Sequence, residues 1–259
     1  TIAKAPLKAT ASSYEITFGD SEPVWNILYS GFVNGENKTV LNELPKVGSI
    51  GAWPLLPGTY NINLSGGTDN NYSFNLTSGK LKINPARIDS VRFDKITFTY
   101  NGQKQAPVIS TSPSGKKLIT SLFDEKGNPI TEMKNAGTYT TRCIVSEPGY
   151  VQDTFFQNLT INKAPLLVTA NDLTVRYNDQ APKYTLTYNG FVAGENAVVI
   201  DSLPTASIEG TWPILPGKYP IRLTKGFDPN YQITLKTGLL TVESLKSTIS
   251  IADTIQTYT

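Results

Sequence analysis

Apolar and polar side chains alternate over many short segments of the chain, which is the pattern of half-buried β-strands. Within residues 58–64, the period of two places Tyr60, Ile62 and Leu64 on one face of a strand. The other alternating segments of the first third of the chain are residues 7–11, 14–18, 24–29, 72–76 and 80–83. The pattern predicts short strands joined by tight turns.

One segment has a different spacing. Val40, Leu41 and Leu44 stand at helical intervals, and Pro45 ends the run, so we expect one short helix within residues 35–44. Glu36 would lie at its first turn, where a carboxylate meets free N–H groups and the positive end of the helix dipole. The same capping role is expected for Glu195 later in the chain. Catalysis is disfavoured, because acid–base work needs a second carboxylate across a cleft.

Residues 163–243 repeat residues 4–84 without an insertion or deletion. Tyr29-Ser-Gly-Phe-Val-Asn-Gly-Glu-Asn37 recurs as Tyr188-Asn-Gly-Phe-Val-Ala-Gly-Glu-Asn196, and Trp53-Pro-Leu-Leu-Pro-Gly-Thr-Tyr60 recurs as Trp212-Pro-Ile-Leu-Pro-Gly-Lys-Tyr219. Roughly 34 of about 81 aligned positions are identical, which indicates a modular array. The identities concentrate on residues that set turns and fill cores.

Residues 85–162 lack both motifs, yet their skeleton aligns with the two outer modules. Tyr100 stands where Phe18 and Tyr177 stand, and Gly149-Tyr150 stands where Asn71-Tyr72 does. We therefore interpret this stretch as a diverged module on the same period of about 80 residues. Residues 124–129 have the composition of a hairpin tip. Because the helix-like segment is missing, an immunoglobulin-type β-sandwich is the alternative.

The two ends of the chain resemble partial modules. Thr1-Ile-Ala-Lys-Ala-Pro6 recurs as Thr160-Ile-Asn-Lys-Ala-Pro165, where one module joins the next, so residues 1–3 are expected to be the last strand of a preceding module. Residues 254–258 resemble the first strand of a module. The predicted organisation is a first module at 4–84, a middle one at 85–162, a third at 163–243 and the start of a truncated fourth at 244–259.

Composition excludes several classes of function. The absence of histidine excludes His-based triads and His metal sites, and a single cysteine, Cys143, excludes an intramolecular disulfide. The formal charge is +2, and the scattered Lys and Arg residues do not form the clustered basic face of a nucleic-acid-binding protein. No apolar run approaches the ~20 residues of a membrane helix. We expect no cofactor, no nucleic-acid partner and no membrane insertion.

Trp53 and Trp212 are the candidate ligand contacts. Each precedes a proline in a segment expected to be a loop, where an exposed indole could stack on the apolar face of a sugar ring. The alternative, which we favour, is that each indole packs over its own module, because both copies retain the surrounding residues. No catalytic, cofactor-binding or metal-binding residue is predicted.

Three further features have a structural interpretation. Asp69-Asn-Asn71 and Asp228-Pro-Asn230 carry oxygens suited to Ca²⁺, but they lack the spaced acidic ligands of a calcium loop, so turn formation is favoured. Cys143 belongs to an alternating run from Tyr139 to Val145 and is expected to be a small buried side chain.

The motifs Tyr-x-Gly-Phe-Val-x-Gly-Glu-Asn, Pro-Gly-x-Tyr and Asn-Tyr make the outer modules similar to MBG-type domains of bacterial surface proteins. The middle module, with Tyr100-Asn-Gly-Gln and Asn135-Ala-Gly-Thr-Tyr139, resembles the related MBG or immunoglobulin-like repeats. The opening Tyr-Gly pair of this type appears here as Phe18-Gly19 and Tyr177-Asn178. The resemblance implies a secreted, adhesin-like protein of Bacteroidetes-type bacteria and no catalytic residues.

These observations predict a mostly β protein of three tandem modules, the outer two β-grasp-like with one short helix each. The leading hypothesis for function is a structural or adhesive stalk on the bacterial cell surface, in which each module contacts mainly its neighbours. Its partners would be neighbouring repeats and host or environmental glycans or proteins. A carbohydrate-binding module that uses Trp53 and Trp212 is the alternative, and an enzyme is a distant third, because no nucleophile–base motif or phosphate loop is present.

Overall fold

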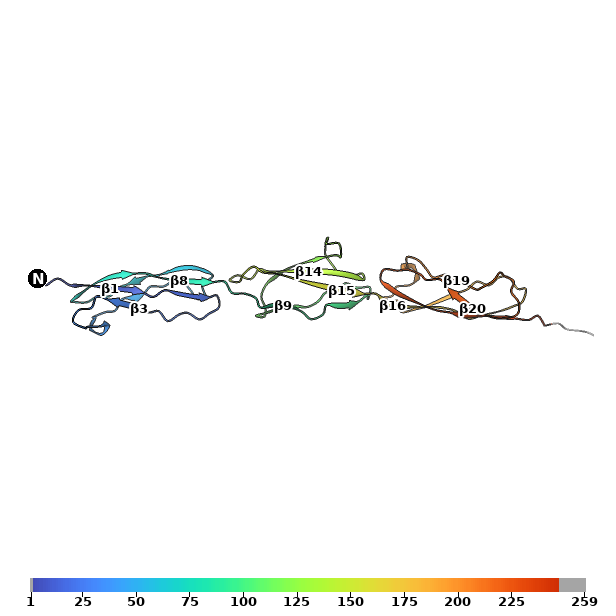
Figure 1. The fold of residues 1–259 in the computed structure, drawn as a ribbon, viewed down its shortest axis with the longest axis horizontal. Helices are drawn as coiled ribbons and strands as arrows, with labels where there is room; N and C mark the ends of the chain where they lie inside the picture. Colours follow the sequence, from blue (N-terminus) through green and yellow to red (C-terminus); the bar gives the residue numbers. More distant parts are fainter. Residues whose placement is uncertain (1, 247–259) are drawn as a thin grey trace, which may run out of the picture. The chain divides into compact units, whose positions relative to one another are not determined.

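The computed structural model describes residues 2–246, and nearly all of their regular structure is β-strand (Figure 1). The chain divides into two compact units, one of residues 1–94, 109–120 and 142–156, the other of residues 95–108, 121–141 and 157–259. The first module lies in the first unit and the third module in the second. The expected fourth module falls, from residue 247 onward, outside the described residues.

The first module consists of eight strands, in sheets whose order is β3-β1-β7, β2-β8-β5 and β4-β6. β1 pairs in parallel with β7, and β2 pairs in parallel with β8, whereas β3 and β5 are antiparallel to their partners. The strands are β1 (Ala5–Ala11), β2 (Tyr14–Thr17), β3 (Ile27–Ser30), β4 (Lys46–Val47), β5 (Gly58–Ile62), β6 (Leu64–Ser65), β7 (Tyr72–Thr77) and β8 (Gly79–Asn84). Each strand expected from alternation in this module is found.

The core of the first module lies where the alternating apolar positions meet. Ala11, Ile62, Leu81 and Ile83 form a buried cluster contributed by β1, β5 and β8. From Leu7 on, every second residue of β1 is buried, as the period of two requires when one face of a strand is covered. Tyr60 and Leu64 pack against the same cluster, which agrees with the face predicted for residues 58–64.

The third module has the same pairing, with sheets β18-β16-β21 and β17-β22-β20-β19. Its parallel registers repeat those of the first module: Ala164 lies opposite Tyr231 as Ala5 lies opposite Tyr72. The strands are β16 (Ala164–Ala170), β17 (Leu173–Arg176), β18 (Leu186–Asn189), β19 (Ala206–Ser207), β20 (Gly217–Leu223), β21 (Tyr231–Lys236) and β22 (Gly238–Glu243). The buried cluster is Ala170, Ile221, Leu240 and Val242.

The middle module contributes to both units. Its larger sheet has the order β10-β15-β14-β12-β13, with β10 parallel to β15, and β9 and β11 form a separate antiparallel pair. The predicted hairpin tip connects β12 to β13, and the Asp124 carboxylate accepts the N–H groups of Lys126 and Asn128 there. The strands are β9 (Ser90–Phe93), β10 (Thr97–Thr99), β11 (Ile109–Ser112), β12 (Leu118–Phe123), β13 (Pro129–Ile130), β14 (Gly137–Val145) and β15 (Thr154–Asn162) (Figure 1).

The prediction of one short helix in each outer module is wrong. Only a three-residue 3₁₀ turn is present at each place, η1 (Lys38–Val40) and η2 (Ala197–Val199). Leu41 and Ile200, which follow the two turns, are already in extended conformation. The β-grasp-like character predicted for the outer modules stays a prediction.

Competing hydrogen bonds explain why the helix does not form. The Asn42 N–H donates to the Asp69 carboxylate at 3.1 Å, and Glu43 exchanges both backbone hydrogen bonds with Thr68. Both N–H groups would have to reach carbonyls four residues earlier in a helix. A long-range bridge and a buried aspartate therefore override the helical spacing of the apolar residues in this segment.

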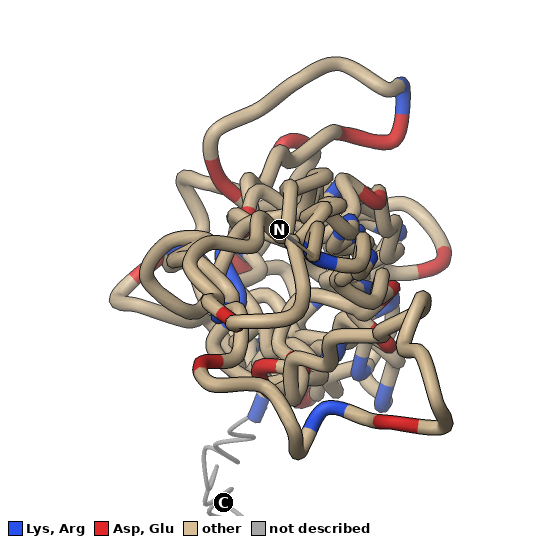
Figure 2. The backbone as a smooth tube through the Cα atoms, turned by 90° about the vertical axis from the view of Figure 1, so that its left-hand side faces the viewer, with Lys and Arg blue, Asp and Glu red and all other residues tan. Residues whose placement is uncertain are grey.

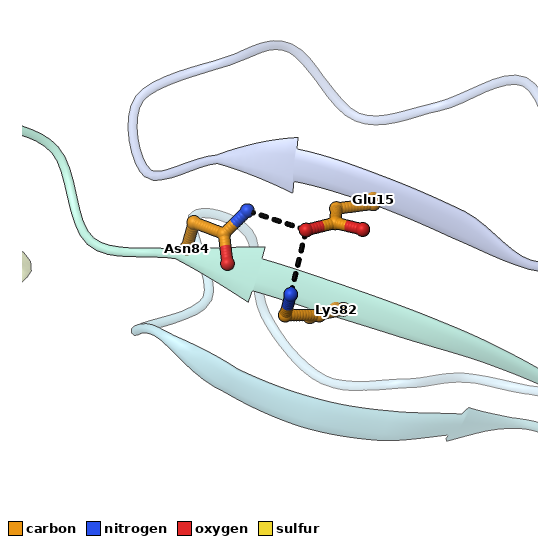
Figure 3. A network of polar contacts seen from close by, with 3 residues as sticks. All are labelled: Glu15, Lys82 and Asn84. Carbon is orange, nitrogen blue, oxygen red and sulfur yellow. Dashed lines mark hydrogen bonds and ion pairs between the residues drawn. The ribbon is translucent and has the colours of Figure 1, made fainter.

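Positions of basic and acidic residues are interspersed along the described backbone (Figure 2). On the outer face of the first module, Glu15 of β2 accepts hydrogen bonds from Lys82 and Asn84 of β8, at 2.6 Å and 2.8 Å (Figure 3). These partners lower the pKa of the Glu15 carboxyl. Exposed pairs of this kind add little to stability. Among residues 2–246, no helical segment has the length and apolar character needed to cross a membrane.

Candidate functional site

The repeated Gly-Phe-Val-x-Gly-Glu-Asn motif builds one end of each outer module. In the third module, Phe191 packs edge-to-face on Tyr231, with ring centroids 5.4 Å apart. The Val192 N–H donates to the Tyr231 hydroxyl at 3.1 Å, and that hydroxyl donates to Glu195 Oε2 at 2.5 Å. Tyr231 lies at the start of β21 and is 2 % exposed. We call Tyr231 with Glu195, and Tyr72 with Glu36 in the first module, the Tyr–Glu pairs.

The Tyr–Glu pair of the third module also holds a residue of the middle module. The Tyr100 hydroxyl donates to Glu195 Oε1 at 2.7 Å, and its ring packs edge-to-face on Tyr231 with centroids 5.5 Å apart. Gly102 lies close to the same loop, since a Cβ on it would be 2.8 Å from the Ala193 Cβ. One carboxylate therefore accepts hydrogen bonds from the tyrosine hydroxyls of two modules, and we call this contact the second junction.

A further hydrogen bond and a short chain connection accompany the second junction. The Ala136 N–H donates to Asn230 Oδ1 at 2.8 Å. Lys163 is the one residue between the end of β15 and the start of β16, and its amino group donates to the Asp228 carbonyl at 2.8 Å. A connection of one residue leaves little freedom of movement between the two modules.

Burial and the carboxylate both keep these tyrosines protonated. Burial is the larger cause and the hydrogen bond to Glu195 the second, and together they raise the pKa of Tyr231 to about 12. The same causes raise the pKa of Tyr100 further still. A phenolate beside Glu195 would place two negative charges in contact, so the neutral form is favoured.

This arrangement predicts a loss of stability at high pH. An unfolded tyrosine titrates near 10, so the stabilisation from Tyr231 is fully present below pH 10 and is lost as pH rises toward 12. Urea unfolding at pH 9 to 12, followed by circular dichroism, should show a falling free energy of unfolding over that window. A Tyr100→Phe/Tyr231→Phe variant, with eleven tyrosines still titrating as background, should show a shallower fall. An unchanged slope in that variant would contradict the assignment.

The contact between the first and middle modules, which we call the first junction, is made by a different set of residues. Phe18, at the end of β2, packs edge-to-face on Tyr150 of the middle module, with centroids 6.0 Å apart, and the Lys116 amino group lies 4.8 Å from the Tyr150 ring centre. The Ala86 N–H donates to the Gly149 carbonyl at 2.9 Å. The middle module lacks the motif that carries the glutamate, so this junction rests on ring packing and backbone bonds.

Aligned residues therefore serve both junctions. Phe18 and Tyr100 contribute the ring from the preceding module, and we call these two residues and the aligned Tyr177 the tip residues. Tyr150 and Tyr231 receive the ring in the following module. The alignment of these positions was visible in the sequence, but only the structure shows that they meet.

The expected capping role of Glu36 and Glu195 is wrong. The capping residues are Asn37 and Asn196, whose side chains accept the N–H groups of Thr39 and Val198 at 3.0 Å. The glutamates accept tyrosine hydroxyls instead. Each glutamate precedes the capping asparagine and so lies outside the turn, which leaves its carboxylate available for the tyrosines.

Both candidate tryptophans lie against the cores of their own modules. Trp53 packs against the cluster of the first module, and Trp212 against that of the third, and each is partly buried. The Trp212 indole N–H donates to the Asp179 carbonyl at 2.8 Å. Their role as ligand contacts stays a prediction.

A pocket of about 220 Å³ lies beside Trp53. Trp25 and Glu22 also line it, and the Trp25 indole N–H donates to Glu22 Oε1 at 3.0 Å. In the third module, Tyr184 and Ala181 stand at the positions of Trp25 and Glu22. The pocket is thus built partly from residues that the two modules do not share.

The aspartate turns and the cysteine are structural. Asp69 accepts the N–H groups of Asn71 and Tyr72, which lower the pKa of its carboxyl, and Asp228 accepts those of Asn230 and Tyr231. No cluster of three or more acidic, cysteine or histidine side chains suited to a metal ion is found among the described residues. Cys143 is fully buried, as predicted, and burial raises the pKa of its thiol.

Comparison with known proteins identifies all three modules. Residues 7–82 and 166–241 match the MBG domain (YGX type), and residues 89–165 match the MBG domain. The middle module is therefore a diverged MBG repeat, the first of the two alternatives. A comparison with curated proteins gave no match. The matched segments cover most of the sequence, and the chain belongs to the MBG domain family as a tandem array of three MBG modules.

Proposed function

We propose that the chain is a non-catalytic spacer or interaction array of an exported bacterial surface protein. MBG repeats are structural domains without catalytic activity, and tandem repeats of this kind are consistent with surface proteins. In such an array each module contacts mainly its neighbours, so length comes from repeat number. The cell surface is the proposed location, and neighbouring repeats together with glycans or proteins are the proposed partners.

The observation that carries this proposal is the sharing of Glu195 between two modules. Its carboxylate accepts the hydroxyls of Tyr100 and Tyr231, at 2.7 Å and 2.5 Å, so its polar groups are used to hold modules together. Hydrogen bonds to a charged acceptor are among the stronger ones in proteins. A spacer needs such contacts between successive modules, whereas an enzyme would keep a carboxylate of this kind open to substrate.

The test is a glycan and host-matrix array screened with the full chain and with a Trp53→Ala/Trp212→Ala variant. If the chain is a spacer whose partners are neighbouring repeats alone, neither protein should show saturable binding. Saturable binding by the natural chain that is lost in the variant would contradict the spacer proposal and favour the carbohydrate-binding alternative. A Tyr60→Phe/Tyr219→Phe variant is the matched control, because both hydroxyls bond within their own loops, to Leu56 and Leu215.

The carbohydrate-binding alternative is favoured by one observation, the pocket beside Trp53. Two indole rings and a carboxylate line it, and this combination of an apolar ring with a hydrogen-bonding group suits a sugar. Under this alternative, binding resides in the first module. Trp53→Ala alone should then abolish the array signal, and Trp212→Ala alone should leave it intact.

A further inference from the structure

The first module carries a Tyr–Glu pair with the same local structure as that of the third. The Tyr72 hydroxyl donates to Glu36 Oε2 at 2.6 Å and accepts the Val33 N–H at 3.1 Å. Phe32 packs edge-to-face on Tyr72 with centroids 5.3 Å apart. The three values differ from those of the third module by 0.1 Å or less.

What differs is the second carboxylate oxygen. In the third module, Glu195 Oε1 accepts the Tyr100 hydroxyl, and Glu195 and Val192 are partly buried. Within residues 2–246, no hydrogen-bond donor is found at Oε1 of Glu36, which is exposed, and Val33 is 47 % exposed. The first module thus presents the same local structure with Glu36 and Val33 exposed.

We propose that Val33, Glu36 and Tyr72 form a docking surface for the tip of another MBG module. The tip would carry Tyr-Asn-Gly, as at residues 100–102, with the tyrosine hydroxyl bound to Glu36 Oε1 and the ring on Tyr72. The glycine is part of the requirement, because Gly102 lies so close to Ala193 that a side chain there would collide with the loop. The tips Phe18-Gly19-Asp20 and Tyr177-Asn178-Asp179 lack that glycine, so the surface selects a tip of the middle-module type.

This proposal deepens the proposed function and rests on it, since an array needs a defined order of modules. The hydrogen bond and the ring contact depend on the tyrosine of the neighbouring tip, and the close approach depends on its glycine, so the surface discriminates at two positions of the neighbour. Such a surface would specify which module type precedes the first module, whether in one chain or between chains. Between separate chains the contact would be weak, because separate modules lack the high effective concentration that a connection within one chain provides.

The experiment exchanges modules within the full chain. Residues 4–84 replace residues 163–243, which have equal length and the same Lys-Ala-Pro start, so that Tyr100 meets a transplanted Glu36. Hydrogen exchange of residues 95–108, present once in the chain, should show the same protection as in the natural chain. Glu36→Ala in the transplanted copy should lower that protection by on the order of tenfold, as expected for a hydrogen bond to a charged group. The same change in the first copy should not.

A second variant keeps the proposal testable if the exchanged chain does not fold. Ala193→Asn/Pro229→Asn places the first module's side chains, those of Asn34 and Asn70, around the natural second junction. Protection of residues 95–108 should be unchanged. A loss as large as that caused by Glu195→Ala, in either design, would overturn the docking surface. If Glu195→Ala itself had no effect in the natural chain, the proposed function would lose its support as well.

Discussion

Replacing Glu195 by alanine is expected to destabilise the third module by about 2–4 kcal/mol, because two nearly buried hydroxyls lose a charged acceptor at once. Tyr100 is 5 % exposed and Tyr231 is 2 % exposed, so water replaces the carboxylate poorly at either site. Hydrogen exchange followed module by module measures the effect, because each module opens with its own free energy. The exchange of residues 95–108 should rise together with that of β21.

Glu36→Ala in the first module is the matched control. Glu36 accepts one hydroxyl, that of Tyr72, and has no tyrosine of a preceding module among the described residues. Its loss should have a smaller effect, confined to the first module. Equal effects of the two substitutions, or no change at residues 95–108 in the Glu195 variant, would show that Glu195 does not join the modules.

Gly149→Ala is expected to open the first junction at a cost of about 2–4 kcal/mol. A Cβ at residue 149 would lie 2.4–2.6 Å from three atoms of the Phe18 ring, and the backbone φ of +87° adds about 1–2 kcal/mol for any side chain. Phe18 must then move away and lose its packing on Tyr150. In a Trp212→Phe background, urea unfolding followed by tryptophan fluorescence reports on the first module, which holds Trp25 and Trp53.

Gly127→Ala is the control that separates the conformational cost of a side chain at positive φ from the collision with the Phe18 ring. Gly127 has a φ of +82° and no atom within 4 Å of a Cβ, so its substitution carries the conformational cost alone. In a Phe18→Ala background the ring is gone, and Gly149→Ala should cost about as much as Gly127→Ala. A full-sized effect in that background would mean that Gly149 acts through something other than the Phe18 contact.

Much of the fold follows from the sequence, because the alternation of a strand is a local pattern and a repeat can be found by aligning the chain with itself. The period of two around Tyr60 and Ile62 placed the inward face of β5 correctly, and the offset between the outer modules predicted their common strand pairing. The helix was mispredicted for a reason that lies elsewhere in the chain. The N–H groups of Asn42 and Glu43 are taken by Asp69 and Thr68, and no local pattern reveals such long-range partners.

The residues of the candidate site could be identified from the sequence, but the contacts between them could not. Glu36 and Glu195 occupy the same position of a repeated motif, and Phe18, Tyr100 and Tyr177 align across the modules. Their contacts arise where one module meets the next, so periodicity within a module carries no information about them. A carboxylate at a turn suggested a cap, but the asparagine that follows it accepts the N–H group two residues later in the sequence and takes that role.

The most direct test of a junction that holds modules together is a double-mutant cycle between Tyr100 and Glu195. Tyr100→Phe, Glu195→Ala and the double variant are compared with the natural chain by hydrogen exchange of residues 95–108 and of the third module. The shared hydrogen bond predicts a coupling of about 1.5–3 kcal/mol, the range for bonds to charged groups. Additivity within about 0.5 kcal/mol would contradict it, because residues that do not interact behave in that way.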